Sequence, residues 1–202
     1  MESIRAQRTP GKRVMGLMLH PISEWAAIDS ESSTPREIYV HYVAPLVAIG
    51  VIAAFLSQVV IGIAVPIFGT VRVPVLPGVV HGLIVYFLSF AGVGLLGLLV
   101  NSLAPTFGGR RDSLRALRVT VYSYTPAWLA GVLRLTPPLD DFSPLIAAYG
   151  VYLLYVGLPV MMRCPKDKAA FYAVAIGGCA VAAFFAADAL GVAMSGSWQL
   201  GA

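Results

Sequence analysis

The chain has 202 residues, of which 58% are hydrophobic and only 12% are charged, whereas soluble domains carry about 25% charged residues. So little polar surface could not cover the core of a soluble protein, and such high hydrophobicity excludes intrinsic disorder. The net charge of +4 is too small and too scattered for a nucleic-acid-binding face. These numbers predict an integral membrane protein.

The first 38 residues precede any long apolar stretch and are expected to remain as a cytoplasmic segment. Their apolar run from Val14 to Leu19 is too short for the core of a cleaved signal peptide. Apolar residues at helical spacing, beside Lys12 and Arg13, allow two interpretations: an amphipathic helix in the membrane interface, or a segment that packs on the bundle. These apolar residues are Val14, Leu17, Met18, Ile22, Trp25 and Ile28.

Four segments without Lys or Arg are long enough to cross a bilayer, which requires about 20 mostly apolar residues. They are residues 43–65, 79–101, 144–162 and 169–194. A fifth segment, 119–135, contains Ser123 and Pro126 and includes Arg134 near its end. It is interpreted as a full span, with a re-entrant or interfacial segment as the alternatives.

The positions of the cations decide between these readings, because Lys and Arg stay preferentially on the cytoplasmic side of short loops. Five spans place twelve of the fourteen cations inside, and only Arg72 and Arg134 outside. Four spans give ten inside and four outside. The sequence therefore predicts an all-α, polytopic membrane bundle of five transmembrane helices in one domain, 39–202, with a cytoplasmic N-terminus and the C-terminus outside.

The last predicted span is rich in small residues and holds a single ionisable group. Residues 169–194 contain eleven Ala and three Gly, which favours close helix packing within the chain, with homo-oligomer formation through this span as the minority interpretation. Asp188 is the one ionisable residue well within a predicted span, since His81 and Arg134 fall at span ends. A hydrated side chain near the outer interface and a proton or cation site are both open interpretations.

No pattern in the chain indicates an enzyme. There is no H-E-x-x-H or other metal-ligand spacing, no glycine-rich phosphate loop, and no pair of intramembrane carboxylates. We expect no catalytic residues, no cofactor and no metal. Cys164 lies in a short basic turn beside the membrane, a permissive setting for S-acylation, although a lone cysteine there is more often unmodified.

The third to fifth predicted spans carry distinctive motifs. The stretches Tyr122 to Gly131, Tyr149 to Pro159 and Met162 to Ala169, with Pro21-Ile-Ser-Glu24-Trp25 upstream, resemble the bacterial branch of the Yip (Ypt-interacting protein) family. The resemblance implies a five-span helical bundle with a cytoplasmic N-terminus, here in the bacterial inner membrane. Eukaryotic relatives are associated with Rab-type GTPases and vesicle formation. That role is not expected here, because the N-terminal segment of this chain is short.

These motifs supply the candidate functional or structural cluster. We expect residues of the third span to meet tyrosines of the fourth, with the tyrosine-bearing face of the fourth span pointing into the bundle, and the following turn to close the cluster. A tyrosine-buttressed helix pair and a ligand site are the two interpretations. The cluster comprises Tyr122, Tyr124, Pro126, Trp128, Tyr152, Tyr155, Pro165 and Lys166.

Two classes of function remain. The first is a non-enzymatic membrane scaffold or adaptor that binds partner proteins or lipids through its basic cytoplasmic loops. The alternative is a small-solute or ion transporter or channel, which would require an oligomer because the chain shows no internal repeat. Its polar lining would come from Gln58, Ser89, Asn101, Ser123, Thr125, Tyr152 and Asp188.

Overall fold

The computed structural model describes residues 9–65, 69–136, 139 and 141–196, without the side chains of residues 63–65, 188, 192, 195 and 196. Four of its helices are long and apolar enough to cross a membrane: Pro35–Ile61, Val75–Leu103, Ser143–Met161 and Lys166–Gly191. They overlap the four strongest predicted spans, but the first helix begins eight residues before the predicted 43–65 and ends at Ile61, and residues 63–65 form a strand. The expectation of an all-α polytopic membrane protein is therefore confirmed.

The first long helix combines α-helical and wider π-helical turns. Thr34 caps its start in a capping box with Glu37. The first π turn ends at Val43, two residues before Pro45, whose missing N–H interrupts the α-helical hydrogen bonds. The N–H of Ala44 there donates to the carbonyl of Tyr39, five residues back. Its parts are α3 (Pro35–Ile38), the π turn Tyr39–Val43, α4 (Ala44–Leu56) and the π turn Ser57–Ile61.

A short hairpin joins the first two long helices. Strands β1 (Ile63–Val65) and β2 (Gly69–Val71) pair antiparallel, and α5 (Val75–Leu103) follows. Gly62, which ends the first helix, has a positive φ of 97° that a side chain would strain. This end of the molecule is called the hairpin end below.

The third predicted span is a broken helix. It comprises α6 (Ser113–Ser123), α7 (Thr125–Ala130) and a 3₁₀ turn (Gly131–Leu135). The break at Tyr124 arises because Pro126 has no N–H to continue the α-helical ladder. Segment 119–135 is thus helical as predicted, but it is not among the four long continuous helices. It packs against α4 and α9.

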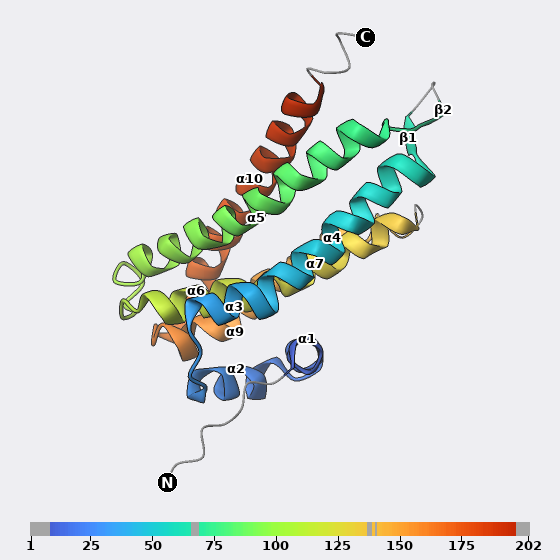
Figure 1. The fold of residues 1–202 in the computed structure, drawn as a ribbon. Helices are drawn as coiled ribbons and strands as arrows, with labels where there is room; N and C mark the ends of the chain where they lie inside the picture. The colour runs from blue at the N-terminus through green and yellow to red at the C-terminus, as the bar shows by residue number, and fades with distance from the viewer. Residues whose placement is uncertain (1–8, 66–68, 137–138, 140, 197–202) are drawn as a thin grey trace.

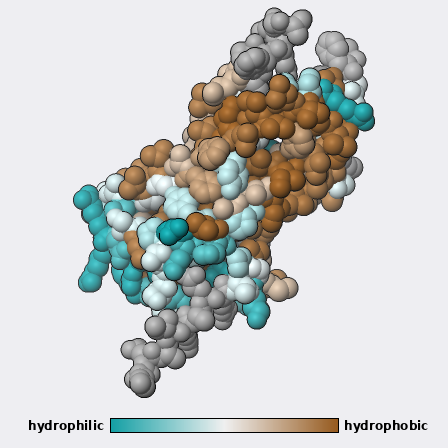
Figure 2. All heavy atoms as spheres, viewed as in Figure 1, coloured by the Kyte–Doolittle hydropathy of each residue, from teal (hydrophilic) through white to brown (hydrophobic). Residues whose placement is uncertain are grey.

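The long helices form two groups that contact each other at several levels. Figure 1 shows α5 and α10 side by side, while α4, α7 and α9 run together beneath them. Helix α9 (Ser143–Met161) returns along α6 and α7, and α10 (Lys166–Gly196) returns along α5. On the face in Figure 2, apolar residues cover the half towards the hairpin end, and hydrophilic residues gather at the opposite end.

One row of small residues on α10 packs within the chain. Ala169 and Ala173 are buried, and a Cβ placed on Gly177 would lie 2.8 Å from the side chain of Val151 on α9. This contact agrees with the expected intrachain role of the small residues in the last span.

Two short helices close the end opposite the hairpin. Helices α1 (Pro10–Leu19) and α2 (Pro21–Ser30) both begin at a proline, and the chain turns between them at His20. Figure 1 shows α2 lying across the bundle while α1 is seen end-on. This pair is called the cap, and its side of the bundle the cap end. Helix α2 packs on α9, while an interfacial position of the segment stays a prediction.

Candidate functional site

The cap is fixed to the bundle by a tryptophan that fills a glycine notch. Trp25 of α2 is completely buried, and a Cβ on Gly157 of α9 would lie 2.6 Å from its ring atom Cε2. The same indole makes an edge contact with Tyr122 of α6, with ring centroids 6.4 Å apart. Only glycine at position 157 leaves room for this ring.

A buried ion-pair cluster lies next to the tryptophan. Arg13 of α1 is only 2% exposed, and its Nη1 donates to Oε1 of Glu24 at 2.6 Å while its Nη2 donates to Glu31. The guanidinium also lies 5.4 Å from the ring centroid of Tyr122. Burial works against the charged form, but the hydrogen bond to Glu31 and the nearby carboxylates outweigh it and raise the pKa of Arg13.

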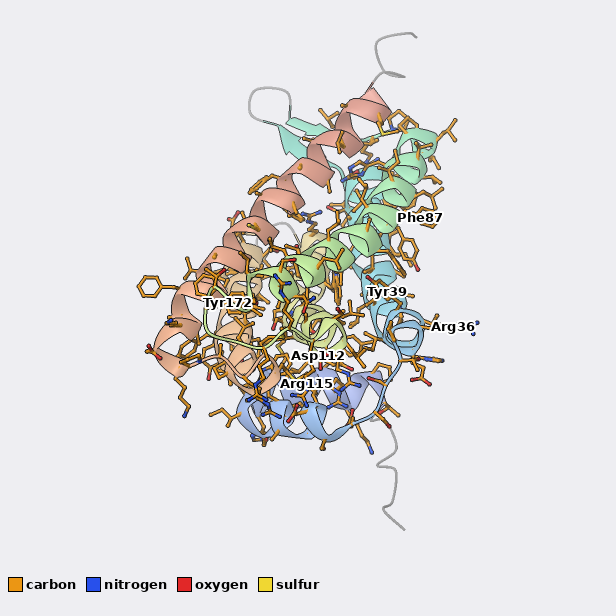
Figure 3. The ribbon with its side chains drawn as sticks, turned by 90° about the vertical axis from the view of Figure 1, so that its left-hand side faces the viewer. Arg36, Tyr39, Phe87, Asp112, Arg115 and Tyr172 are labelled. Atoms are coloured by element: carbon orange, nitrogen blue, oxygen red, sulfur yellow. The ribbon has the colours of Figure 1, made fainter. Side chains whose placement is uncertain are left out.

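Further arginines connect α2 and the segment after it to the rest of the bundle. Arg118 of α6 donates to the backbone carbonyls of Glu31, at 2.9 Å, and Ser33, at 3.1 Å. Asp29 accepts from Arg163 at 2.6 Å and pairs with Arg115 at 3.2 Å. One carboxylate thus links α2 to α6 and to the turn after α9. Figure 3 shows Arg115 pointing from α6 towards the cap.

These contacts form one site, which consists of Arg13, Glu24, Trp25, Glu31, Tyr122 and Gly157. Beside it is a cavity of about 280 Å³. The cavity combines charged and aromatic walls, which come from Thr9, Pro10, Arg13, Glu31, Glu37, Ile38, His41, Tyr42 and Tyr122.

Part of the predicted cluster does come together. Tyr42 of the first long helix packs edge-on against Tyr122, with centroids 4.8 Å apart, and shares a 2.8 Å hydrogen bond with the Thr125 hydroxyl. Tyr124 packs against Trp128 at 5.6 Å and donates to the Ala180 carbonyl of α10 at 3.4 Å. Pro126 is buried in the same region. The third segment is therefore a hub between α4, α9 and α10.

The expectation that Tyr152 and Tyr155 face the bundle interior is wrong. They are 42% and 44% exposed, because α9 packs through the opposite face. That face carries Gly150, Leu153, Leu154, Gly157, Leu158 and Met161. Tyr149 of the same row instead reaches the cap, where its hydroxyl donates to the carbonyl of Met18 at 3.2 Å.

The turn after α9 lies at the cap end. Pro165 and Lys166 are exposed, and Pro165 packs against Gly108, where an added Cβ would lie 3.2 Å from the proline ring. The Cys164 side chain is buried, and burial raises the pKa of its thiol. Both effects disfavour the reactive thiolate that S-acylation would require.

Three of the side chains suggested as a channel lining, those of Ser89, Asn101 and Thr125, make separate local contacts. Ser89 donates to Val85 of its own helix, and Asn101 donates to Ser113 at the cap end. Asp188 belongs to α10, but its side chain lies outside the described residues. Within the part of the chain that the structure describes, no three His, Cys, Asp or Glu residues are grouped as metal ligands.

The sequence did not reveal the ion-pair cluster, because Arg13, Glu24 and Glu31 have no recognisable spacing. The element Pro21-x-x-Glu24-Trp25 was the available signal. In the structure its proline starts α2, its glutamate binds Arg13 and its tryptophan fills the Gly157 notch. The element and the later motifs are thus two sides of one interface.

The region of the chain that matches known proteins includes residues from both sides of this interface. The Yip1 domain matches residues 15–187, which include Glu24, Trp25, Tyr122 and Gly157. The chain belongs to the Yip1 family. It is 28% identical over 159 residues to inner membrane protein YohC of Escherichia coli strain K12. The matched region covers 77% of this chain and 81% of YohC.

YohC of Escherichia coli O6:H1 strain CFT073 matches with the same identity and coverage. No solved structure matches the chain significantly. The predicted family and the predicted inner-membrane location of this Yip1-family protein are confirmed.

Proposed function

We propose that this Yip1-family protein is a non-enzymatic membrane scaffold or adaptor that binds anionic lipids or partner proteins at its cap end. The observation that carries the proposal is the locked cap. Arg13 joins α1 to α2, Trp25 of α2 packs on Gly157 of α9, and Asp29 of α2 pairs with Arg163 in the turn that leads to Lys166. The exposed groups of that turn are therefore held in a fixed arrangement. A fixed charged surface binds with a smaller entropic cost than flexible tails do.

The surface in question lies on two adjacent turns. Arg110 and Arg111 follow α5, while Lys166 and Lys168 begin α10, and all four side chains are exposed. The backbone N–H of Arg110 donates to the carbonyl of Met162 at 2.8 Å, which joins the two turns. Each such cation near a membrane surface contributes about 1 kcal/mol of attraction to anionic lipid.

The proposed orientation has five passes, with the cap in the cytoplasm and the C-terminus outside. The support is the distribution of cations, since the four residues above gather at the cap end and Arg72 lies beyond β2 at the hairpin end. A reporter fused to the C-terminus tests it. Activity of a reporter that functions only outside the cytoplasm is expected, and activity of a strictly cytoplasmic reporter would contradict the topology.

Lipid retention tests the scaffold proposal. The full chain, reconstituted in nanodiscs that contain anionic and zwitterionic lipids, is expected to enrich anionic lipid in its nearest shell. Replacing Arg110, Arg111, Lys166 and Lys168 with Gln should abolish that enrichment, whereas Arg72→Gln serves as the matched control. Cross-linking from the same four positions in cells tests for protein partners.

Lipid enrichment or cross-linked partners in the wild-type protein, with their loss in the fourfold variant, would support the proposal. Neither lipid enrichment nor a partner in the wild-type protein would overturn it.

A further inference from the structure

The corner where α1 meets α2 exposes large apolar side chains. Met15, Leu19 and Ile22 are 64%, 60% and 71% exposed. Met15 and Leu19 lie one turn apart on the same face of α1, and Ile22 follows just after the turn at His20. The other side of the cap is docked on the bundle, so this face is left open.

The corner lies beside the bundle and not beyond its end. The Tyr149 hydroxyl donates to the carbonyls of Leu17 and Met18, near the end of α1, at 3.4 and 3.2 Å. Tyr149 lies twelve residues before Met161 along α9, so this contact is on the side of the helix and not at its tip. Because α9 is long and apolar enough to cross a membrane, the end of α1 lies alongside a candidate membrane span.

The neighbours of the corner have the chemistry of a membrane interface. Tyr152 and Tyr155 stand half-exposed on α9, on the stretch between Tyr149 and the cap end of that helix, and tyrosine is enriched at the headgroup level of bilayers. Lys12 is exposed one turn before Met15, where its long stem can extend along apolar surface while its ammonium group stays in water. Apolar, aromatic and basic residues in this arrangement are typical of helices that lie in the interface.

We propose that the α1–α2 corner is an in-plane anchor, with Met15, Leu19 and Ile22 inserted at the boundary between headgroups and acyl chains on the cap side of the bilayer. The occupant of this apolar face is lipid. The proposal goes beyond the scaffold function and does not depend on it, because the corner inserts whether or not the basic turns bind partners.

Site-directed spin labelling tests the anchor on the full chain in lipid vesicles. Nitroxide labels are attached to single cysteines at positions 15, 19 and 22 in a chain whose Cys164 and Cys179 are replaced by Ala. Exposed positions Ser23 and Ser30 of α2 provide matched controls. Oxygen, which concentrates in lipid, should collide with the first three labels several-fold more often, relative to a water-soluble nickel chelate, than with the two controls.

Two results would overturn the proposal. Labels at 15, 19 and 22 that collide mainly with the nickel chelate would place the corner in water. Labels that are immobile and reached by neither reagent would place it against protein, as in a dimer.

A second variant avoids the cysteine replacements. Leu19→Trp should show more quenching by lipids brominated near the headgroup end of the acyl chain than the wild-type tryptophans show. No additional quenching would contradict insertion.

Discussion

The cap end and the hairpin end of the bundle are stabilised in different ways. At the cap end, partners are specific pairs: Trp25 requires Gly157, and Arg13 requires Glu24 and Glu31. Towards the hairpin end, α4 and α5 leave between them an apolar groove of about 300 Å³, lined by residues such as Ile52, Phe55 and Leu83. The cap end therefore constrains residue identity at these pairs, whereas the apolar side chains that line the groove are constrained mainly in residue class.

The largest expected effect comes from Arg13→Met. This change removes the buried cation that both Glu24 and Glu31 bind, which should lower the free energy of unfolding in detergent by about 3–5 kcal/mol. Lys12→Met, at the exposed neighbouring position, is the matched control and should have little effect. Equal stability of the two variants would show that the ion-pair cluster does not stabilise the fold.

Gly157→Ala should have the next largest effect. The new Cβ would lie 2.6 Å from the Trp25 ring, and overpacking of this kind costs about 1–3 kcal/mol. Gly178→Ala on α10 is the control, since a Cβ there meets nothing within 4 Å. Thermal unfolding in detergent measures the stability of both variants. Equal stability of Gly157→Ala and Gly178→Ala would contradict the tight packing of Trp25 against Gly157.

Tyr42→Phe should have a smaller effect. It removes the 2.8 Å hydrogen bond to the buried Thr125 hydroxyl, a loss of about 0.5–1.5 kcal/mol. Tyr155→Phe, on the exposed face of α9, should be neutral in the same unfolding measurement. A larger loss at Tyr155 would mean that the packed face of α9 has been misassigned.

The reactivity of Cys164 gives the smallest effect and leaves stability unchanged. Because burial raises the pKa of this thiol, its thiolate fraction at pH 8 is below that of an exposed cysteine, and its alkylation should continue to accelerate at higher pH. In a Cys179→Ala background, the comparison is with Ser30→Cys, which adds an exposed thiol. Equal rates and equal pH profiles for the two thiols would contradict the burial of Cys164.

Composition and charge position predicted most of the fold, because a lipid environment imposes long apolar helices on any sequence. Segments 43–65, 79–101, 144–162 and 169–194 all correspond to long helices. The break at Tyr124 was harder to predict, since Pro126 is compatible with a kink in a continuous helix as well as with two helices.

The candidate site was predicted only in part. Tyr122, Tyr124, Pro126 and Trp128 do form a packed hub, but the outward position of Tyr155 depends on which face of α9 carries its glycines. Arg13 could not be found from spacing, because its partners lie on a different helix and in the segment that follows it. Such contacts across the chain leave no local periodicity.

Hydrogen exchange of the full chain in nanodiscs, read by mass spectrometry, tests the locked cap most directly. The amides of α1 and α2 should be protected in the wild-type protein nearly as well as those of α9. In Arg13→Met, the cap amides should exchange much faster while those of α4 and α5 do not change. Rapid exchange of α1 and α2 in the wild-type protein, or unchanged protection in Arg13→Met, would contradict the account.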